Sequence, residues 1–269
     1  MKKFLLIPDS FKGTMSSTQI CEIMKRVIVV HYPDAQVVSI PVADGGEGSV
    51  DSFLTAMGGK KVFVEVTGPY FEKMEAFYGI VDDSVGIIEM AACAGLPLVG
   101  DDKHPDKTTT YGVGELIAHA IENGCKKIIV GLGGSATNDG GTGAAAALGV
   151  RFYDKNGNHF VPTGGTLANI ERIDMSGRLP ALEHIELLTM CDIDNPLYGL
   201  QGAAYVFSPQ KGADDEMVAF LDSQLIALSN AVKTHLGTDV SNLPGAGAAG
   251  GMGAGMVAFL GSKLNMGIE

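Results

Sequence analysis

The chain has 269 residues, of which 46% are hydrophobic and 19% charged, and its formal net charge at pH 7 is −12. This length provides one large or two ordinary domains, and it buries a sizeable core without disulfides or a structural metal. The acidic charge argues against nucleic acids and anionic membranes as partners, since both require a basic face. The four cysteines show no metal-binding or redox spacing, so we expect reduced thiols in a cytoplasmic protein.

Two apolar stretches could be mistaken for membrane segments. Residues 3–7 are too few for the apolar region of a signal peptide, and Pro8 and Asp9 follow them directly. Residues 243–261 carry no charge, but seven of these 19 residues are glycine, which makes a stable membrane span unfavourable. We therefore predict no membrane partner.

The N-terminal part of the chain alternates between strand and helix patterns. Residues 3–7, 36–42 and 62–66 are apolar runs typical of strands. Ser16 and Gln19 form a capping-box pattern that predicts a helix start between the first two runs. That helix should have an apolar face of Ile20, Ile23, Met24, Val27 and Ile28. A second helix, ending at Met57, should precede the third strand, and the resulting β-α-β-α-β series predicts a parallel sheet covered by helices.

The pattern changes after residue 67. Residues 74–81 and 85–90 flank a short polar turn, which predicts an antiparallel hairpin. We therefore predict two domains: residues 1–67 as a Rossmann-like α/β domain and residues 68–269 as a second, inserted α/β domain with a mixed sheet. The fold class is α/β.

The second domain contains further clear elements in chain order. Helices are expected at 113–121, 142–148 and 214–236 and close to the C-terminus, strands at 127–130 and 185–191, and a hairpin turn at 156–157. Several of the predicted strands end in polar, glycine-rich loops. In open α/β sheets ligands bind at these carboxyl ends, and glycine lets backbone N–H groups approach an anion closely.

The loop at 131–141 is the clearest anion-binding candidate, because it follows a strand and precedes a helix. Its pattern Gly131-x-Gly133-x-x-Ala136 also satisfies a relaxed dinucleotide fingerprint, although such matches are frequent in a glycine-rich chain. A tight connection without any ligand is the third interpretation. The sequence contains no Walker A motif, no protein-kinase signature, no Gly-x-Ser-x-Gly elbow and no zincin helix.

Charged residues follow other predicted strands. Asp44 and Glu47 lie among glycines, where acids suit Mg²⁺ binding, proton transfer or simply capping of a helix. Asp192 and Asp194 are similar candidates, with turn formation as the structural alternative. Lysines in such loops can hold a carboxylate or a phosphate. The two candidates are Lys12, which lies in the first loop with Asp9, and Lys211.

Six segments together resemble the motifs of the bacterial type I glycerate kinases. In chain order, the segments are Pro8-Asp9-Ser10-Phe11-Lys12-Gly13, Ala43-Asp44-Gly45-Gly46-Glu47-Gly48, the whole loop at 131–141, Cys191-Asp192-Ile193-Asp194-Asn195-Pro196-Leu197, Phe207-Ser208-Pro209-Gln210-Lys211-Gly212-Ala213 and Pro244-Gly245-Ala246-Gly247-Ala248-Ala249-Gly250-Gly251. They extend over the whole chain, and six long motifs in the same order make the resemblance specific.

The resemblance implies a two-domain α/β enzyme that phosphorylates D-glycerate with ATP and Mg²⁺ in the cleft between its domains. It favours 2-phosphoglycerate as the product, with 3-phosphoglycerate as the alternative. Phosphoryl transfer needs positioning and charge neutralisation rather than a protein nucleophile, and glycine loops, acids and lysines supply both. The resemblance also implies a further segment after these motifs that completes the first domain, so we expect this chain to be incomplete and its own turnover to be uncertain.

We therefore predict Asp44, Asp192 and Lys12 as catalytic residues, with Asp44 and Asp192 also as candidate metal ligands. The predicted substrate- and phosphate-binding residues are Asp9, Ser10, Gly45, Gly46, Glu47, Gly133, Gly134, Ser135, Thr137, Asn138, Asp139 and Lys211. Two alternatives stay open: a nicotinamide-dependent oxidoreductase, based on the glycine fingerprint, and a form that binds ligand without turnover. The partners are small molecules, and an assembly of identical subunits is also left open.

Overall fold

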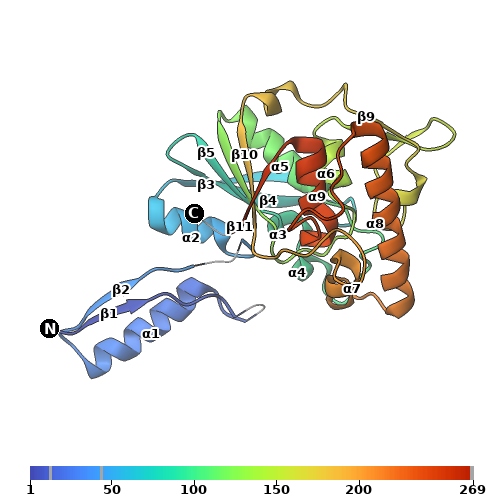
Figure 1. Cartoon of the computed structure of the whole chain (residues 1–269). Helices are drawn as coiled ribbons and strands as arrows, with labels where there is room; N and C mark the ends of the chain where they lie inside the picture. The colour runs from blue at the N-terminus through green and yellow to red at the C-terminus, as the bar shows by residue number, and fades with distance from the viewer. Residues whose placement is uncertain (12–13, 43–44, 267–269) are drawn as a thin grey trace.

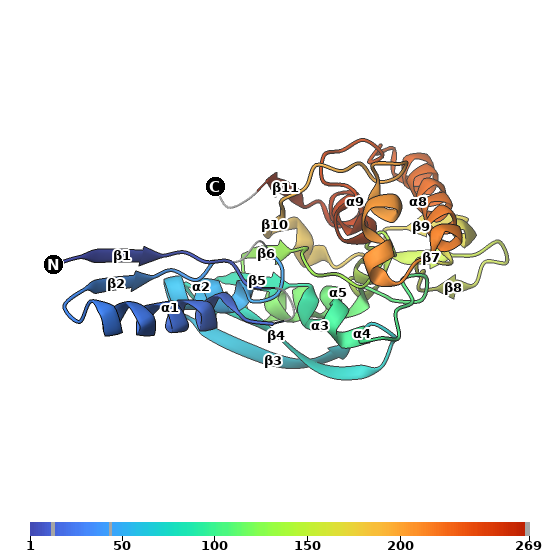
Figure 2. The same cartoon turned by 90° about the horizontal axis from the view of Figure 1, so that it is seen from below.

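The computed structural model describes residues 1–11, 14–42 and 45–266, which form a small N-terminal lobe and a larger body (Figure 1). The lobe contains β1 (Lys3–Leu6), α1 (Ser17–His31) and β2 (Gln36–Ser39). Strands β1 and β2 pair in parallel, as predicted. Seen after a 90° turn, the lobe extends from one side of the body (Figure 2).

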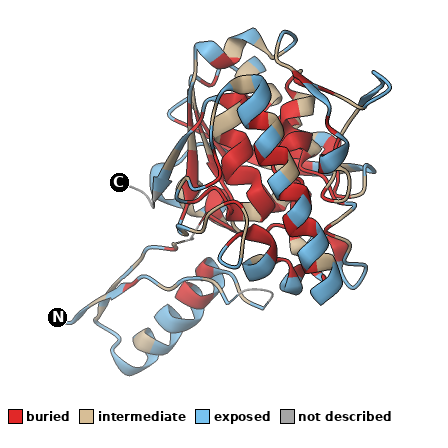
Figure 3. Cartoon of the chain, turned by 45° about the vertical axis from the view of Figure 1, so that its right-hand side comes forward, coloured by how far each residue is buried: buried red, intermediate tan, exposed pale blue. Residues whose placement is uncertain are grey.

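Helix α1 begins where the capping box predicts. The Ser16 hydroxyl accepts a hydrogen bond from the Gln19 N–H at 3.2 Å, and the Gln19 side chain accepts one from the Ser16 N–H at 2.9 Å. Of the predicted apolar face, Ile20 is buried, whereas Val27 is 50% exposed. Figure 3 shows the same contrast between the buried start of α1 and its exposed remainder.

A six-stranded mixed sheet forms the centre of the body. Its order is β11-β10-β6-β5-β4-β3. The strands are β3 (Lys60–Thr67), β4 (Lys73–Val81), β5 (Val85–Glu89), β6 (Lys127–Gly131), β10 (Glu186–Cys191) and β11 (Lys263–Met266). β5, β6, β10 and β11 run parallel, and the predicted hairpin of β4 and β5 is confirmed.

The prediction for the third strand was wrong. β3 does not extend the parallel sheet of the lobe; it pairs antiparallel with β4 along its whole length. Helix α2 (Ser49–Met57) also packs against β4 and β5. An apolar run is compatible with either sheet, and only the pairing partner decides between them. The division of the chain after residue 67 stays a prediction, and these contacts favour an earlier boundary, before α2.

The remaining elements surround the sheet. The helices are α3 (Ala91–Ala94), α4 (Leu96–Val99), α5 (Tyr111–Glu122), α6 (Thr142–Ala147), α7 (Ala203–Phe207), α8 (Asp215–Leu236) and α9 (Ala248–Leu260), with short 3-10 turns η1 (Leu167–Asn169), η2 (Pro180–Glu183) and η3 (Pro209–Lys211). A small antiparallel sheet contains β7 (Arg151–Tyr153), β8 (His159–Phe160) and β9 (Arg172–Asp174). The predicted α5, α6, α8 and β10 are confirmed, and the α/β fold class holds.

The uncharged stretch at 243–261 does not form one continuous helix. Ala249, Gly250 and Gly251 have left-handed backbone, with φ of 54°, 66° and 87°, at the start of α9. Glycine accepts this conformation at little cost, which accounts for glycine at positions 250 and 251. Within the described part of the chain, no helix has both the length and the apolar character that crossing a membrane requires.

Candidate active site

The carboxyl ends of β5, β6 and β10 meet at one edge of the central sheet. In the strand registers Glu89 lies beside Gly131, and Gly131 lies beside Met190. The loops that leave these strands therefore start next to one another. They include the glycine-rich loop at 131–141 and Asp192, as the sequence predicted for a ligand site in a parallel sheet.

A cavity of about 280 Å³ lies at this edge. Its walls come from the loop after β6, the end of β10, the turn η3 and the start of α9. They contain five predicted site residues, namely Gly133, Gly134, Ser135, Asp192 and Lys211, together with apolar neighbours such as Met190 and Phe207. Residues that are far apart in the sequence thus form one small pocket, and its described wall residues include one cation, Lys211, and one carboxylate, Asp192.

Lys211 is the most unusual residue of this cavity. Its side chain is buried, and the ammonium group donates hydrogen bonds to the Ser135 hydroxyl at 2.9 Å and to the Thr137 carbonyl at 2.6 Å. No carboxylate among the described residues forms an ion pair with it. Desolvation lowers the pKa of Lys211 to about 7, and the field of Asp139 opposes this shift only in part. Within the described part of the chain, the site therefore holds a cation that lacks a close counter-ion.

Asp139 stabilises the loop rather than lining the cavity. One carboxylate oxygen accepts hydrogen bonds from the Thr110 N–H at 2.8 Å, the Thr110 hydroxyl at 2.8 Å and the Gly143 N–H at 3.2 Å. The other accepts from the Gly141 N–H at 3.0 Å. Burial raises the pKa of this carboxyl, and these four hydrogen bonds lower it. Its hydrogen-bonding capacity is used inside the protein, which assigns it a structural role.

Two neighbours of Asp139 have unused polar atoms. The hydroxyl of Thr137 and both amide atoms of Asn138 are buried and have no hydrogen-bond partner in the described part of the structure. Buried polar groups usually find a partner, and unpaired ones often lie near a ligand or an internal water. Neither residue contributes to the cavity wall. The Thr137 carbonyl that Lys211 contacts belongs to the peptide bond between these two residues.

Glycines of the loop make a contact that the dinucleotide hypothesis did not anticipate. The Gly133 N–H donates a hydrogen bond to the Gly45 carbonyl at 3.0 Å. A Cβ atom on Gly131 would lie 2.2 Å from that carbonyl oxygen, and one on Gly133 would lie 2.5 Å from the Cα of Gly46. These two glycines allow the segment that follows the lobe to pack on the loop, so the close approach expected for a dinucleotide is taken by the protein's own backbone.

We expect Gly133→Ala to lower kcat/KM by on the order of 100-fold, because the added methyl group separates two backbones that meet near the cavity and misplacements of about 1 Å have such effects. Steady-state kinetics of the phosphotransfer predicted from the sequence, with glycerate and ATP as substrates, would measure this. Gly86→Ala is the matched control: Gly86 is also buried, and a Cβ there meets only side chains, at 3.4 Å. Equal kinetics for the two variants would contradict the role of this contact.

The other predicted residues form a second group. Ser10 and Glu47 line a larger cavity of about 730 Å³. Residues of the N-terminal turns of α1 and α2 also line this cavity. Asp9 is exposed and accepts a hydrogen bond from the Ser10 N–H at 2.6 Å, without lining this cavity. Gly45 and Gly46 are buried in the contact with the loop at 131–141. Lys12 and Asp44 lie outside the described residues.

Glu89 is a residue of this second cavity that the sequence reading missed. It ends β5, is only 3% exposed and accepts a hydrogen bond from the Val50 N–H at the start of α2, at 3.0 Å. Burial raises the pKa of Glu89 to about 7. The available signal was a single acid at the end of an otherwise apolar strand, next to the strand that leads into the glycine-rich loop.

Replacing Glu89 should make stability less sensitive to pH. The pKa of Glu89 is 4.5 when unperturbed and about 7 in the folded protein, so folding favours the protonated carboxyl. The contribution of this protonated form to the free energy of unfolding is complete below pH 4.5 and is lost as the pH rises to 7. Glu89→Gln stays neutral and should be as stable as the parent at pH 4 but about 3 kcal/mol more stable at pH 8. Urea unfolding at both pH values tests this, with the exposed Glu75→Gln as control. A constant difference between Glu89→Gln and the parent would contradict it.

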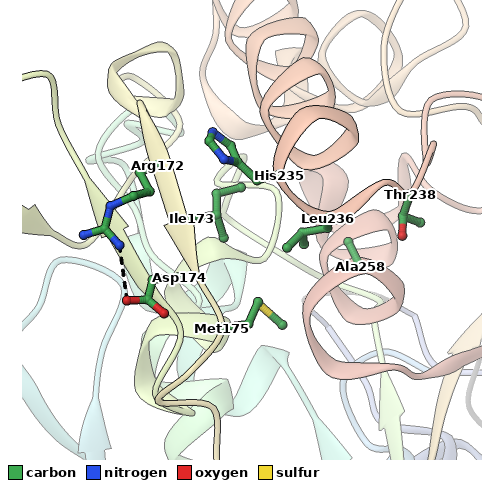
Figure 4. A pocket seen from close by; sticks show the side chains of 8 residues that line it. All are labelled: Arg172, Ile173, Asp174, Met175, His235, Leu236, Thr238 and Ala258. Atoms are coloured by element: carbon green, nitrogen blue, oxygen red, sulfur yellow. Dashed lines mark hydrogen bonds and ion pairs between the residues drawn. The ribbon is translucent and has the colours of Figure 1, made fainter.

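A third cavity, of about 580 Å³, lies away from this edge, between β9 and the end of α8 (Figure 4). Arg172 is its only arginine or lysine and pairs with Asp174 at 3.2 Å. Much of the remaining wall is apolar, including Ile173, Met175 and Leu236. Because its cation is already paired and no strand of the central sheet ends there, this cavity is a weaker candidate for an anionic substrate than the one at Lys211.

The described residues do not form a metal cage. Among residues 1–11, 14–42 and 45–266, no group of three or more histidine, cysteine, aspartate or glutamate side chains could hold an ion. Mg²⁺ commonly needs only one or two carboxylates when substrate phosphates supply further oxygens. Asp192, the one carboxylate among the described wall residues of the smaller cavity, meets that requirement.

Comparisons with known proteins point to one family. The profile of the Glycerate kinase family matches residues 4–269. The chain is 48% identical to a glycerate kinase of Bacillus cereus and 46% identical to a glycerate 2-kinase of Escherichia coli K12, over 99% of its own length and 71% of each relative. A crystal structure from Salmonella typhimurium LT2, provisionally described as glycerate kinase 2, matches with a TM-score of 0.87 and 43% identity, over 99% of this chain and 72% of that one.

The matches extend over both the lobe and the body, and they include every segment that builds the two cavities. Membership of a kinase family also argues against the nicotinamide-dependent alternative. The glycines on which that alternative was based serve backbone packing in this structure. From the motifs, the fold and these relatives together, the chain belongs to the glycerate kinase family.

Proposed function

We propose that the protein phosphorylates D-glycerate with ATP and that the cavity at Lys211 is the glycerate site. The observation that carries this is the buried ammonium of Lys211, which has neutral hydrogen-bond partners and no counter-ion among the described residues. A small hydroxy acid supplies one negative charge and fits a cavity of about 280 Å³. Its carboxylate would contact Lys211, and its hydroxyl groups would extend toward Asp192.

For ATP we propose the larger cavity, lined by Ser10, Ser17 and Glu47. The N-terminal turns of α1 and α2 open onto it, and the partial positive charge of a helix N-terminus suits phosphate groups. Carboxylates in its wall suit phosphates that carry Mg²⁺. The hydrogen bond from the Gly133 N–H to the Gly45 carbonyl joins the loop of the smaller cavity to the segment that carries Glu47 of the larger one.

Two roles suit Asp192. Its carboxylate can accept the proton of the attacking hydroxyl, or it can hold the Mg²⁺ that neutralises the transferred phosphoryl group. In both, the protein supplies positioning and charge rather than a covalent intermediate. We further propose 2-phosphoglycerate as the product, in line with the name of the Escherichia coli relative. The four buried free thiols support a reducing, cytoplasmic location.

A coupled assay tests this function. The protein is incubated with ATP, Mg²⁺ and D-glycerate, and ADP release is followed alongside the Escherichia coli relative as positive control. Enolase alone converts 2-phosphoglycerate, whereas 3-phosphoglycerate also requires a mutase, so omitting the mutase identifies the product. Glycerate binding without ADP release would favour the non-catalytic alternative, and stabilisation by NADH but not by an ATP analogue would contradict the proposal.

A further inference from the structure

Lys211 has a feature that goes beyond holding an anion. Its ammonium group is taken out of water and surrounded by neutral acceptors, the Ser135 hydroxyl and the Thr137 carbonyl. Forming a charge in such a place is costly unless an opposite charge arrives with it. Without an anion, this environment therefore disfavours the protonated, charged form of Lys211. An anion bound in the cavity would favour that form.

Among the described residues, the charged groups around Lys211 do not supply this opposite charge. Asp139, from the loop after β6, acts on it only through space, because its oxygens are bound by Thr110, Gly141 and Gly143. Asp192, at the end of β10, lines the same cavity but forms no ion pair with Lys211 among the described residues. From the loop before α5, Lys103 donates to the Gln210 carbonyl at 3.5 Å and adds positive charge. The start of α9 contributes only Ala248 and Ala249 to the cavity.

We propose that the carboxylate of the acid substrate binds Lys211 and that its arrival draws a proton from the buffer onto this side chain, so that substrate binding and protonation of Lys211 are coupled. This inference rests on the proposed function, because it takes the cavity at Lys211 as the site of the acid substrate. It adds which group of the substrate is recognised and a dependence of affinity on pH. The carboxylate of glycerate is ionised throughout the neutral range, so the proton taken up belongs to the protein.

The coupling predicts the direction and size of the pH effect. With a pKa of about 7 in the free site, about half of the molecules carry the binding-competent ammonium at pH 7 and about 1% at pH 9. The dissociation constant for D-glycerate should therefore rise about 50-fold between these pH values. Proton uptake should be about half a proton per glycerate at pH 7 and close to one at pH 8.5.

Isothermal titration calorimetry of the whole protein with D-glycerate, in buffers of different ionisation enthalpy at pH 7 and 8.5, measures this uptake directly. Lys211→Met should abolish the uptake and weaken glycerate binding at pH 7, whereas Lys103→Met should retain both.

Glycerate binding to the parent protein with no net proton uptake at either pH would overturn the coupling. This result does not depend on whether any variant folds. Uptake that persists in a folded Lys211→Met variant would assign the proton to another group and would overturn it too. If the parent neither binds nor phosphorylates glycerate, the proposed function itself fails, and the coupling fails with it.

Discussion

Replacing Asp139 with alanine is expected to destabilise the protein by about 4 kcal/mol, because it removes four hydrogen bonds and leaves buried donors unsatisfied, each at a cost of about 1–3 kcal/mol. The donors belong to Thr110 at the start of α5 and to Gly141 and Gly143 around the start of α6. The carboxylate therefore joins two helix starts to the glycine-rich loop. Urea unfolding followed by circular dichroism measures the loss.

Asp139→Asn is a second variant that keeps part of this hydrogen bonding. Its amide oxygen can still accept the three hydrogen bonds that now reach one carboxylate oxygen, while its NH₂ group meets the Gly141 N–H, so about half of the loss is expected. Asp101→Ala, at an exposed position, should change stability little. If Asp139→Ala is as stable as Asp101→Ala, the loop does not depend on this carboxylate.

Replacing Asp192 with asparagine is expected to lower kcat by about 10²–10⁴-fold, the usual contribution of a general base, with a smaller change in KM. Asparagine keeps the shape of the side chain but cannot accept the proton of the attacking hydroxyl and carries no charge for Mg²⁺. Steady-state kinetics at saturating ATP and varied glycerate separate kcat from KM. The prediction follows from the position of Asp192 as the only carboxylate in the described wall of the cavity.

Asp194→Asn provides a matched control, since Asp194 is an exposed acid two residues away that does not line this cavity. Raising Mg²⁺ distinguishes the two roles of Asp192: activity recovers if it was a metal ligand and stays low if it was the base. Asp44→Asn in the same assay ranks the two predicted acids. Unchanged turnover in Asp192→Asn would remove this residue from the mechanism.

Local sequence patterns predicted most elements of the body correctly. The hairpin of β4 and β5 follows from two apolar runs around a polar turn, and α5 follows from helical periodicity that ends at Gly124. The partner of β3 could not be predicted in the same way. An apolar strand is compatible with any sheet edge, and its antiparallel partner β4 is recognised only once the chain is folded.

Sequence reasoning recovered part of the candidate site for a physical reason. Lys211 and Ser135 were both selected because each lies in a polar loop with glycine, but they are 76 residues apart and nothing local predicts their 2.9 Å hydrogen bond. The selection of Asp139 rested on the same loop, and only the structure shows its oxygens turned toward Thr110, Gly141 and Gly143. Glu89 was missed because burial, which raises its pKa, is a property of the folded chain.

By itself, the sequence determined that this protein is an acidic α/β chain and that six ordered motifs place it with the glycerate kinases. Those conclusions depend on residue order and periodicity, which are local. Tertiary structure alone decided why Gly131 and Gly133 are glycine and which lysine is buried without an ion pair among the described residues. Close backbone contact and desolvation arise only when distant segments pack together, because both depend on what surrounds a residue rather than on its neighbours in the chain.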